Sequence, residues 1–380
     1  MRLTFFTPYF YPYVSGMTTF PLLLLKHWAK THQVEVITFA YQPQLALRQS
    51  LGRLTIYRLR PTLRLHKGFI SLSAGAFFAD RVRQTDLVLT NLPNFEGWPL
   101  VWLAKRHHKP VLALYHCRVD LGPGLVNRLL HFGLDASVAF QLKTAQLIIG
   151  TSPDYLQSQP QLAPYLNKCQ AIYPPMPPLT VSRPALAHFL QLKGKRRWLG
   201  FVGRIAREKG LIYLADALHH LPHRSRYELV MAGPEPAKVA GETKFYRQFI
   251  TRLKHLGLTF RHFGYLSPNA LSGFYQALDV LVLPSLNSTE AFGQVQVEAM
   301  QLGTPVIASA LPGVRLPVQA TGMGLLVAPH QSQALAQALH QVITRREIYT
   351  SAAQRDLAKR LFNYRLALKQ YDQALAAVTR

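Results

Sequence analysis

The sequence is poor in cysteine and has no long apolar run. Its 380 residues include two cysteines, Cys117 and Cys169, which exclude a disulfide framework and a cysteine-rich zinc site and fit a reducing compartment. The apolar run Pro21–Leu25 falls far short of the roughly 18 residues that a membrane span needs. Prolines closely follow the apolar segment Leu3–Thr7, which we therefore interpret as a strand and not as part of a signal peptide.

Acidic residues are also scarce, with 18 acidic against 43 basic side chains and a net charge of +25. The excess is spread along the chain, since residues 1–180 hold 18 basic and 7 acidic side chains. Such a field attracts nucleic acid, anionic lipid headgroups and phosphorylated substrates. We find no helix-turn-helix, zinc-finger or aromatic RNA-binding motif, so we do not expect specific nucleic-acid binding.

Short apolar strands alternate with amphipathic helical stretches, which predicts an α/β fold with parallel sheets. The expected strands are Leu3–Thr7, Val34–Phe39, Leu54–Leu59, Leu87–Thr90, Val111–Tyr115, Leu147–Thr151, Ala171–Tyr173, Trp198–Val202, Tyr227–Ala232, Thr259–Phe263, Val280–Leu283, Pro305–Ser309 and Gly324–Val327. The proline-rich segment 173–178 separates two doubly wound domains, 1–178 and 179–356. A helix over 357–380 is expected to return to the first domain. In such sheets ligands bind beyond the carboxyl ends of the strands.

A loop in the second half has the residues of an anion site. Gly203 follows a predicted strand and lets the backbone turn closely, and Arg204 and Lys209 follow it. An arginine fork and a mobile lysine charge could converge on one diphosphate, although this spacing by itself is also that of a solvated loop.

Two carboxylates, Glu290 and Glu298, lie eight positions apart across a loop-to-helix junction. Helical periodicity begins at Gln294, and Gly303 can end the helix in the left-handed conformation. The helix N-terminus suits a phosphate, and Glu298 lies about 7.5 Å further along the axis. The pattern favours one carboxylate on each side of a diphosphate; the alternative is two unrelated surface glutamates.

Three further positions follow strands. Gly264 and Tyr265 could hold a planar base through backbone hydrogen bonds and ring packing, or simply form a strand exit. Gly16 opens a helix in a close-approach turn that matches neither a Walker loop nor a dinucleotide fingerprint. His116 ends a predicted strand at an edge where substrates bind.

Other chemistries lack their motifs. The sequence has no Asp-x-Asp pair, no Cys/His cluster with ligand spacing and no Gly-x-Ser-x-Gly elbow. We therefore expect metal-independent chemistry without a cofactor, in which cations and helix amides stabilise the charge of a leaving group.

Taken together, these motifs resemble the retaining, GT-B-fold glycosyltransferases of glycosyltransferase family 4, over nearly the whole chain. Glu-Ala-Phe-Gly-x4-Glu-Ala-Met, from Glu290 to Met300, looks like the family signature, and Gly203 to Gly210 looks like its phosphate loop with one extra residue. The stretch from Phe263 to Ser285, including Tyr275 and Asp279, looks like its base-binding segment.

The resemblance implies a GT-B fold and a role for each matching position. Glu290 would contact the donor sugar near the reacting carbon, and Glu298 would bind the ribose hydroxyls. The remaining implied donor contacts are Arg204 and Lys209 with the amides of Phe292, Gly293, Gln294 and Val295 for the diphosphate, Gly264 and Tyr265 for the base, Gly16 for close approach, and His116 for the transferred sugar. The departing phosphate would accept the acceptor's proton, so no protein base is required.

The segment Leu311–Pro317 departs from the family pattern, because Arg315 stands where an acidic residue is common. The donor base, uridine or guanosine, the sugar, the acceptor and the linkage therefore stay open. We expect a cytoplasmic glycosyltransferase that builds a cell-envelope glycolipid or polysaccharide at the inner face of an anionic membrane. A first candidate for membrane contact is the helix from Leu22 to Lys30; the alternative is that its leucines belong to the core. The alternatives are a nucleotide-sugar epimerase on the same fold and a non-catalytic polyanion-binding module.

Overall fold

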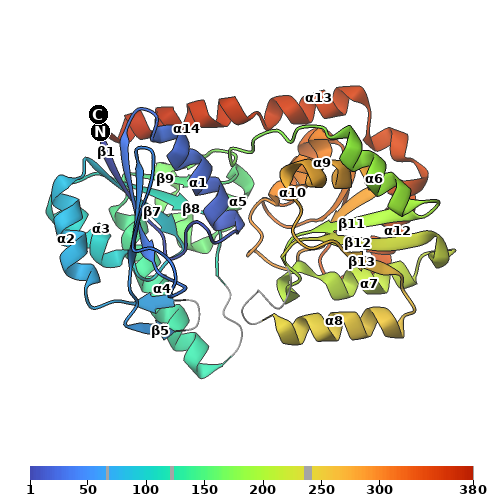
Figure 1. The fold of residues 1–380 in the computed structure, drawn as a ribbon, viewed down its shortest axis with the longest axis horizontal. Helices are drawn as coiled ribbons and strands as arrows, with labels where there is room; N and C mark the ends of the chain where they lie inside the picture. Colours follow the sequence, from blue (N-terminus) through green and yellow to red (C-terminus); the bar gives the residue numbers. More distant parts are fainter. Residues whose placement is uncertain (66–67, 120–123, 235–241, 380) are drawn as a thin grey trace. The chain divides into compact units, whose positions relative to one another are not determined.

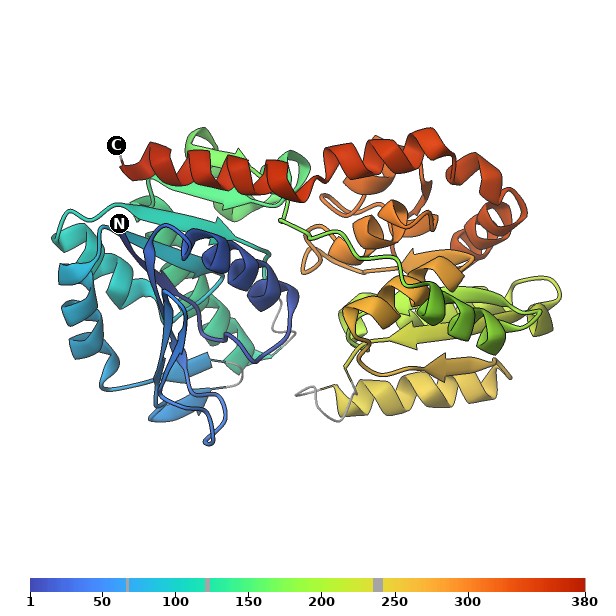
Figure 2. The same cartoon turned by 45° about the horizontal axis from the view of Figure 1, so that its top comes forward.

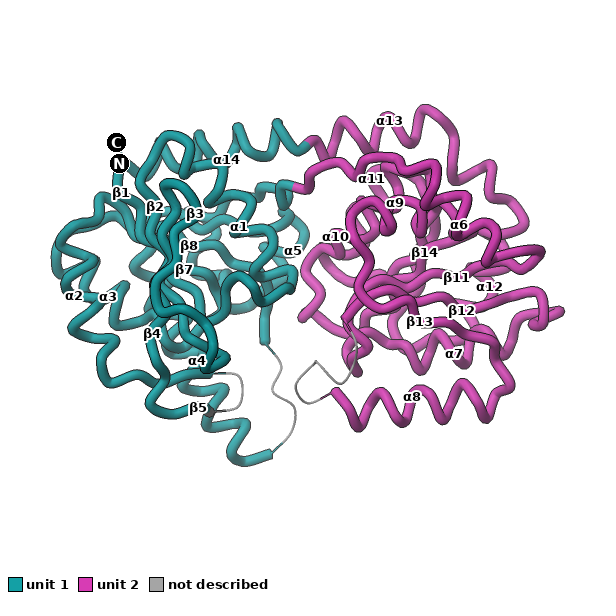
Figure 3. Tube along the Cα trace, viewed as in Figure 1, with its two compact units in different colours: residues 1–175, 364–380 teal, residues 176–363 magenta. Residues whose placement is uncertain are grey.

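The computed structural model describes residues 1–65, 68–119, 124–234 and 242–379 (Figure 1). Two compact α/β units make up the chain: unit 1 holds residues 1–175 and 364–380, and unit 2 holds residues 176–363 (Figure 3). The boundaries lie three residues before and seven residues after the expected ones at 178 and 356.

Unit 1 is built on an eight-stranded sheet with the order β10-β9-β8-β7-β1-β2-β4-β3, parallel except for β3. The strands are β1 Arg2–Phe6, β2 Gln33–Phe39, β3 Arg48–Leu51, β4 Leu54–Leu59, β7 Leu87–Leu92, β8 Val111–Tyr115, β9 Leu147–Gly150 and β10 Cys169–Ala171, with a separate hairpin of β5 Leu63–Leu65 and β6 Gly68–Ile70. The helices are α1 Gly16–Trp28, α2 Ala74–Gln84, α3 Trp98–Arg106, α4 Leu125–Thr144, α5 Pro153–Ser158 and α14 Tyr364–Thr379, and residues 160–168 form a 3₁₀ helix. The strand predicted at Ala171–Tyr173 is observed two residues earlier, as β10. Strands β3, β5 and β6 were not predicted.

Helix α1 belongs to the core of unit 1. Leu24, Leu25 and Trp28 are at most 1% exposed, and they pack with α14, whose Tyr371 is equally buried. The Trp28 indole donates a hydrogen bond of 2.9 Å to Asp372. Leu24 and Leu25 are therefore core residues, in agreement with the alternative that the leucines of this helix belong to the core, whereas Leu22 and Leu23 are partly exposed.

Unit 2 has a six-stranded parallel sheet with the order β13-β12-β11-β14-β15-β16. The strands are β11 Arg197–Val202, β12 Tyr227–Ala232, β13 Phe260–His262, β14 Val280–Leu283, β15 Val306–Ser309 and β16 Gly324–Val327. The helices are α6 Arg183–Lys193, α7 Leu211–His219, α8 Thr243–His255, α9 Pro268–Ala277, α10 Gln294–Gln301, α11 Leu316–Thr321, α12 Ser332–Thr344 and α13 Ala352–Leu361, with 3₁₀ turns at 207–209, 224–226 and 346–349. All six predicted strands are confirmed to within one residue at each end.

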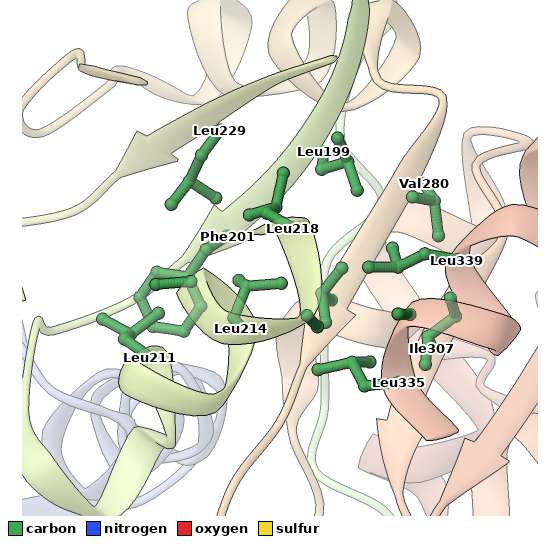
Figure 4. Close-up of a cluster of buried hydrophobic side chains, with 14 of the residues drawn as sticks. Leu199, Phe201, Leu211, Leu214, Leu218, Leu229, Val280, Ile307, Leu335 and Leu339 are labelled. Atoms are coloured by element: carbon green, nitrogen blue, oxygen red, sulfur yellow. The ribbon is translucent and has the colours of Figure 1, made fainter. Parts of the chain in front are cut away.

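Helices cover both faces of the sheet in unit 2 (Figures 1 and 2). On one face, Leu199 and Phe201 of β11 pack with Leu214 of α7 and Leu339 of α12 (Figure 4). On the other face, Trp198 packs with residues of α9 and α10. Because successive strand residues point to opposite faces, a continuous apolar strand needs both layers of helices.

The single helix expected over 357–380 is two helices. Helix α13 ends at Leu361 and stays with unit 2, whereas α14 begins at Tyr364 and joins unit 1. The break contains Asn363, a residue type that favours helix ends over interiors. No helix in the described part of the chain combines the length and apolar character that crossing a bilayer requires.

Candidate functional site

At the carboxyl-terminal edge of the sheet in unit 2, three neighbouring strands are followed by glycines, which have no side chain. Gly203, Gly233 and Gly264 follow β11, β12 and β13, with φ angles of 144°, 153° and 67°. The Gly233 N–H donates to the Gly264 carbonyl at 2.9 Å, and a Cβ added at Gly233 would lie 2.1 Å from the Gly203 oxygen. Gly233 was not singled out from the sequence, although Ala-Gly-Pro after a predicted strand is a recognisable signal. These ends let a flat ligand approach the peptide planes closely.

Lys209 and Glu290, 81 positions apart, meet at this edge. The Lys209 ammonium forms an ion pair and hydrogen bond with Glu290 Oε2, and the two side chains are 18% and 16% exposed. The Ser285 hydroxyl donates to the same oxygen at 3.4 Å. Any anion bound by Lys209 therefore lies next to the Glu290 carboxylate.

The turn that carries Lys209 is docked against the segment after β14. The Leu286 N–H donates to the Glu208 carbonyl at 2.9 Å. Gly210 has a left-handed φ of 68°, and a Cβ there would lie 2.0 Å from the Pro284 carbonyl oxygen. Glycine at 210 thus permits the close contact that sets the position of Lys209 relative to Glu290.

Arg204 engages other carboxylates. Its guanidinium forms an ion pair with Glu208 at 2.9 Å and lies 4.0 Å from Glu242. Arg204 and Lys209 were expected to converge on one anion; here they lie in the same loop but contact different carboxylates. A bound diphosphate would compete with Glu208 for Arg204.

The N-terminus of α10 is held by buried contacts. Gly293 precedes the helix in the left-handed conformation, with φ 74°. The Phe292 ring is 3% exposed and packs against Phe362, so only its backbone is available to a ligand. The buried Gln296 amide donates to the carbonyls of Phe292 and Val314 at 2.6 and 2.9 Å. Gln294 and Val295, the first two residues of α10, are partly exposed.

Glu298 lies one turn further along α10 and accepts a 2.7 Å hydrogen bond from the Tyr275 hydroxyl of α9. Burial raises the pKa of the Glu298 carboxyl, and the tyrosine hydrogen bond opposes that rise. Burial, with the nearby carboxylate second, raises the pKa of Tyr275 well above its ordinary value. Tyr275 therefore acts as a fixed hydrogen-bond donor that orients Glu298.

Tyr265 follows Gly264 with its side chain 69% exposed, available to a planar ligand. Asp279, which the resemblance grouped with the base-binding segment, lies at the opposite edge of the sheet. It is 2% exposed and binds the Trp198 N–H at 2.8 Å and the Lys193 ammonium at 2.6 Å. Asp279 is therefore a structural residue, because the strand β14 separates it from the site.

In unit 1, Gly16 is exposed and begins α1. Ser15 precedes the helix, and its N–H donates to the Thr18 hydroxyl at 2.9 Å. A Cβ added at Gly16 would have no neighbour within 4 Å among the described residues. Packing inside the unit therefore gives no reason for a glycine at this position.

His116 ends β8 and is 7% exposed. Its Nε2 lies 2.5 Å from Asn91 Oδ1, while the Asn91 amide nitrogen donates to the Thr7 hydroxyl and the Met17 carbonyl at 3.1 Å each. The Met17 carbonyl can only accept a hydrogen bond, so the group of Asn91 that faces it is the NH₂ and the Asn91 oxygen faces the His116 ring. Since that oxygen can also only accept, Nε2 of His116 carries the proton. The Nδ1 atom is then the acceptor. Asn91 was not identified from the sequence.

Burial lowers the pKa of His116 from 6.5 to about 4, so the ring is neutral at pH 7. As the pH falls from about 6.5 to about 4, the unfolded chain binds this proton more readily than the folded chain. The stability that the neutral ring contributes is therefore present above about 6.5 and is lost across that interval.

Asn91→Asp should raise the pKa of His116 by about 1–3 pH units, because it places a carboxylate against Nε2 and stabilises the charged ring. The measurement is an NMR titration of the imidazole. Asn91→Ser, which adds no charge, is the matched control and should leave the pKa within the acidic range. An unshifted titration in Asn91→Asp would contradict the contact.

The described residues contain no group of three or more His, Cys, Asp or Glu side chains placed to hold a metal ion.

Comparisons with known proteins cover both units. The family model for Glycosyltransferase Family 4 matches residues 14–174, and the model for Glycosyl transferases group 1 matches residues 182–359. An uncharacterised glycosyltransferase of Methanocaldococcus jannaschii is 28% identical over 186 residues, which are 44% of this chain and 45% of that protein. A D-inositol 3-phosphate glycosyltransferase of Xylanimonas cellulosilytica is 34% identical over 168 residues, 44% of this chain and 38% of that protein. The chain thus spans less than half the length of these two relatives.

A longer match joins the chain to a D-rhamnosyltransferase of Pseudomonas aeruginosa, 28% identical over 303 residues, 76% of this chain and 72% of that protein. Among solved structures, Anabaena HepE in complex with UDP and glucose superposes with a TM-score of 0.80 at 19% identity, covering 99% of this chain and 100% of that one. Sucrose-phosphate synthase of Thermosynechococcus elongatus gives a TM-score of 0.76 at 22% identity, covering 99% of each chain. The chain has the GT-B fold, and its two family matches are both to glycosyltransferases.

Proposed function

We propose that this chain, a glycosyltransferase of the GT-B fold, transfers a sugar with retention of configuration from a nucleotide-diphosphate donor. The observation that carries the proposal is the contact between Lys209 and Glu290 beside the N-terminus of α10. It combines a cation for a diphosphate, a helix terminus for the same anion, and a carboxylate next to them.

The donor would lie along the glycine edge of unit 2. Lys209 and Arg204 would bind the diphosphate together with the first amides of α10, from Phe292 to Val295. Glu298, oriented by Tyr275, would accept hydrogen bonds from the ribose hydroxyls. Gly264 and Tyr265 would contact the base.

Glu290 would hold the sugar next to the bond that breaks. The bond between the anomeric carbon and the diphosphate oxygen breaks with its electron pair on the diphosphate, and the acceptor oxygen forms the new bond on the same face. The departing phosphate takes the acceptor's proton. Lys209, Arg204 and the helix amides stabilise the charge of the leaving group, so the proposed step requires no metal. His116 would accept a hydrogen bond from a sugar hydroxyl through Nδ1, and Gly16 would approach the donor from unit 1.

The proposed acceptor is a glycolipid or polysaccharide of the cell envelope, reached at the cytoplasmic face of a membrane. The charge supports this part of the proposal, because 43 basic side chains against 18 acidic ones favour an anionic surface. The solved neighbour HepE is known in complex with UDP and glucose and with UDP-glucose, and one relative is a D-rhamnosyltransferase. UDP and its sugars are therefore the first ligands to test, with GDP as the alternative.

Lys209→Met should weaken the binding of UDP, or of GDP, by about ten- to a hundredfold, because a charged contact to the diphosphate is lost. Calorimetric titration of the wild type with both nucleotides identifies the base, and the same titration of the variant measures the loss. Lys359→Met is the matched control, since Lys359 is 58% exposed and pairs with Asp356 on α13. Absence of binding to either nucleotide in the wild type would refute the proposed donor class.

A further inference from the structure

The first half of α4 carries large apolar side chains that face water. Leu125, Val126, Leu129 and Phe132 are 75%, 65%, 68% and 77% exposed. Their spacing of three and four residues places them on one side of the helix. In the second half of α4 the opposite side of the helix, with Ser137, Val138, Gln141 and Leu142, is packed into unit 1. Figure 1 shows the first turns of α4 at the lower edge of that unit.

Two further elements of unit 1 carry exposed apolar side chains. Ile70 of β6 and Phe95 in the loop before α3 are 36% and 42% exposed. The Ser137 hydroxyl of α4 donates to the Phe95 carbonyl at 3.0 Å, and the Phe69 N–H of β6 donates to the Glu96 carboxylate at 2.8 Å. These bonds connect the hairpin to the loop and the loop to the second half of α4. We call the exposed apolar side of the first half of α4 the α4 surface: Leu125, Val126, Leu129 and Phe132. A contiguous apolar surface of this kind marks an interaction site more strongly than scattered side chains do.

The charged side chain in the first half of α4 is basic. Arg128 is exposed there, and the chain as a whole has a net charge of +25. Of the nearby acids, Glu96 is 8% exposed and Asp135 accepts a 2.6 Å hydrogen bond from Gln161. The α4 surface therefore presents apolar side chains next to Arg128 on a strongly basic chain, which complements an anionic and amphipathic partner.

We propose that the α4 surface inserts into the interface of a bilayer that contains anionic lipid. Leu125, Leu129 and Phe132 would leave water for the upper acyl region, while Arg128 reaches a headgroup phosphate. This inference rests on the proposed function, which includes an acceptor at a membrane. It deepens that function by naming the surface that contacts the lipid. We prefer it to α1 as the lipid-contacting element because Leu24 and Leu25 of α1 are core residues.

The test is co-sedimentation of the full chain with phosphatidylcholine vesicles prepared with and without phosphatidylglycerol. The wild type should bind the anionic vesicles. Leu129→Ser combined with Phe132→Ser should lower the apparent affinity about tenfold or more, because exposed apolar area no longer enters the lipid. Arg128→Ser should lower it about fivefold on anionic vesicles alone. Val181→Ser with Ile348→Ser, two residues of unit 2 that are each 55% exposed, is the matched control and should bind like the wild type.

Equal binding by the wild type and the Leu129/Phe132 variant would overturn the proposal, as would failure of the wild type to bind either vesicle. Self-association that the same variant abolishes, without lipid binding, would assign the surface to a second copy and also overturn it. Sedimentation needs no sugar donor, so the nucleotide titration of the preceding subsection judges the donor site independently.

Discussion

Glu290→Gln is expected to lower the rate of sugar transfer by about a hundred- to a thousandfold, the size of effect that follows loss of a positioned charge at a reacting centre. The substitution preserves the shape of the side chain but removes its charge. In the structure this carboxylate is held by Lys209 and Ser285, so a neutral amide would keep the position and lose the electrostatic contribution. The measurement is the turnover rate with the nucleotide sugar that the titrations select.

The control for this variant is Asp356→Asn, which removes one carboxylate from an exposed position on α13 and should transfer sugar at the wild-type rate. Nucleotide binding should persist in Glu290→Gln, because the diphosphate is proposed to contact Lys209, Arg204 and the helix amides. Full activity in Glu290→Gln would remove Glu290 from the chemistry and leave it a structural partner of Lys209.

Gly210→Ala is expected to lower the free energy of unfolding of unit 2 by about 3 kcal/mol or more, since it combines a left-handed backbone with a steric overlap. The added Cβ would lie 2.0 Å from the Pro284 oxygen, a backbone atom that cannot rotate away. Any relaxation would also displace the turn that carries Lys209, so transfer activity should fall along with stability.

Gly257→Ala separates the two causes. Gly257 has a similar φ of 62°, but a Cβ there would meet nothing within 4 Å in the described part of the chain. This variant should lose about 1 kcal/mol, the cost of the left-handed conformation for a residue with a side chain. Urea unfolding, monitored by tryptophan fluorescence, compares the free energies of unfolding of the two variants with that of the wild type. If both variants lose the same amount, the contact with Pro284 has no energetic effect.

The four central strands of unit 2, β11, β12, β14 and β15, could be predicted because each is a short, mainly apolar segment that is buried on both faces. Strand β3 in unit 1 could not, because Arg48-Gln49-Ser50-Leu51 has no apolar pattern and pairs antiparallel at the sheet edge. A polar edge strand depends on its neighbour and not on its own composition.

The residues of the site were predicted more easily than their partners. Parallel topology brings the loops after β11 and β14 to one edge, and this is enough to expect Lys209 near Glu290. That Arg204 turns to Glu208, and that Asn91 sets the tautomer of His116, depends on side-chain geometry that spacing does not encode. The same limit explains why the sequence left both interpretations of α1 open. A leucine-rich helix face has the same sequence pattern whether it packs in a core or faces lipid, and only burial distinguishes them.

The assignment of α14 to unit 1 has a consequence for synthesis of the chain. Unit 2 possesses all of its residues once position 363 has left the ribosome. Unit 1 is synthesised first, but it cannot complete its core until α14 has been made, because Tyr371, Asp372 and Leu375 cover Trp28 and its neighbours. The nascent first unit therefore carries an uncovered apolar strip while the second folds, although domains commonly fold in the order in which they are made. In this chain the later unit can be completed before the earlier one.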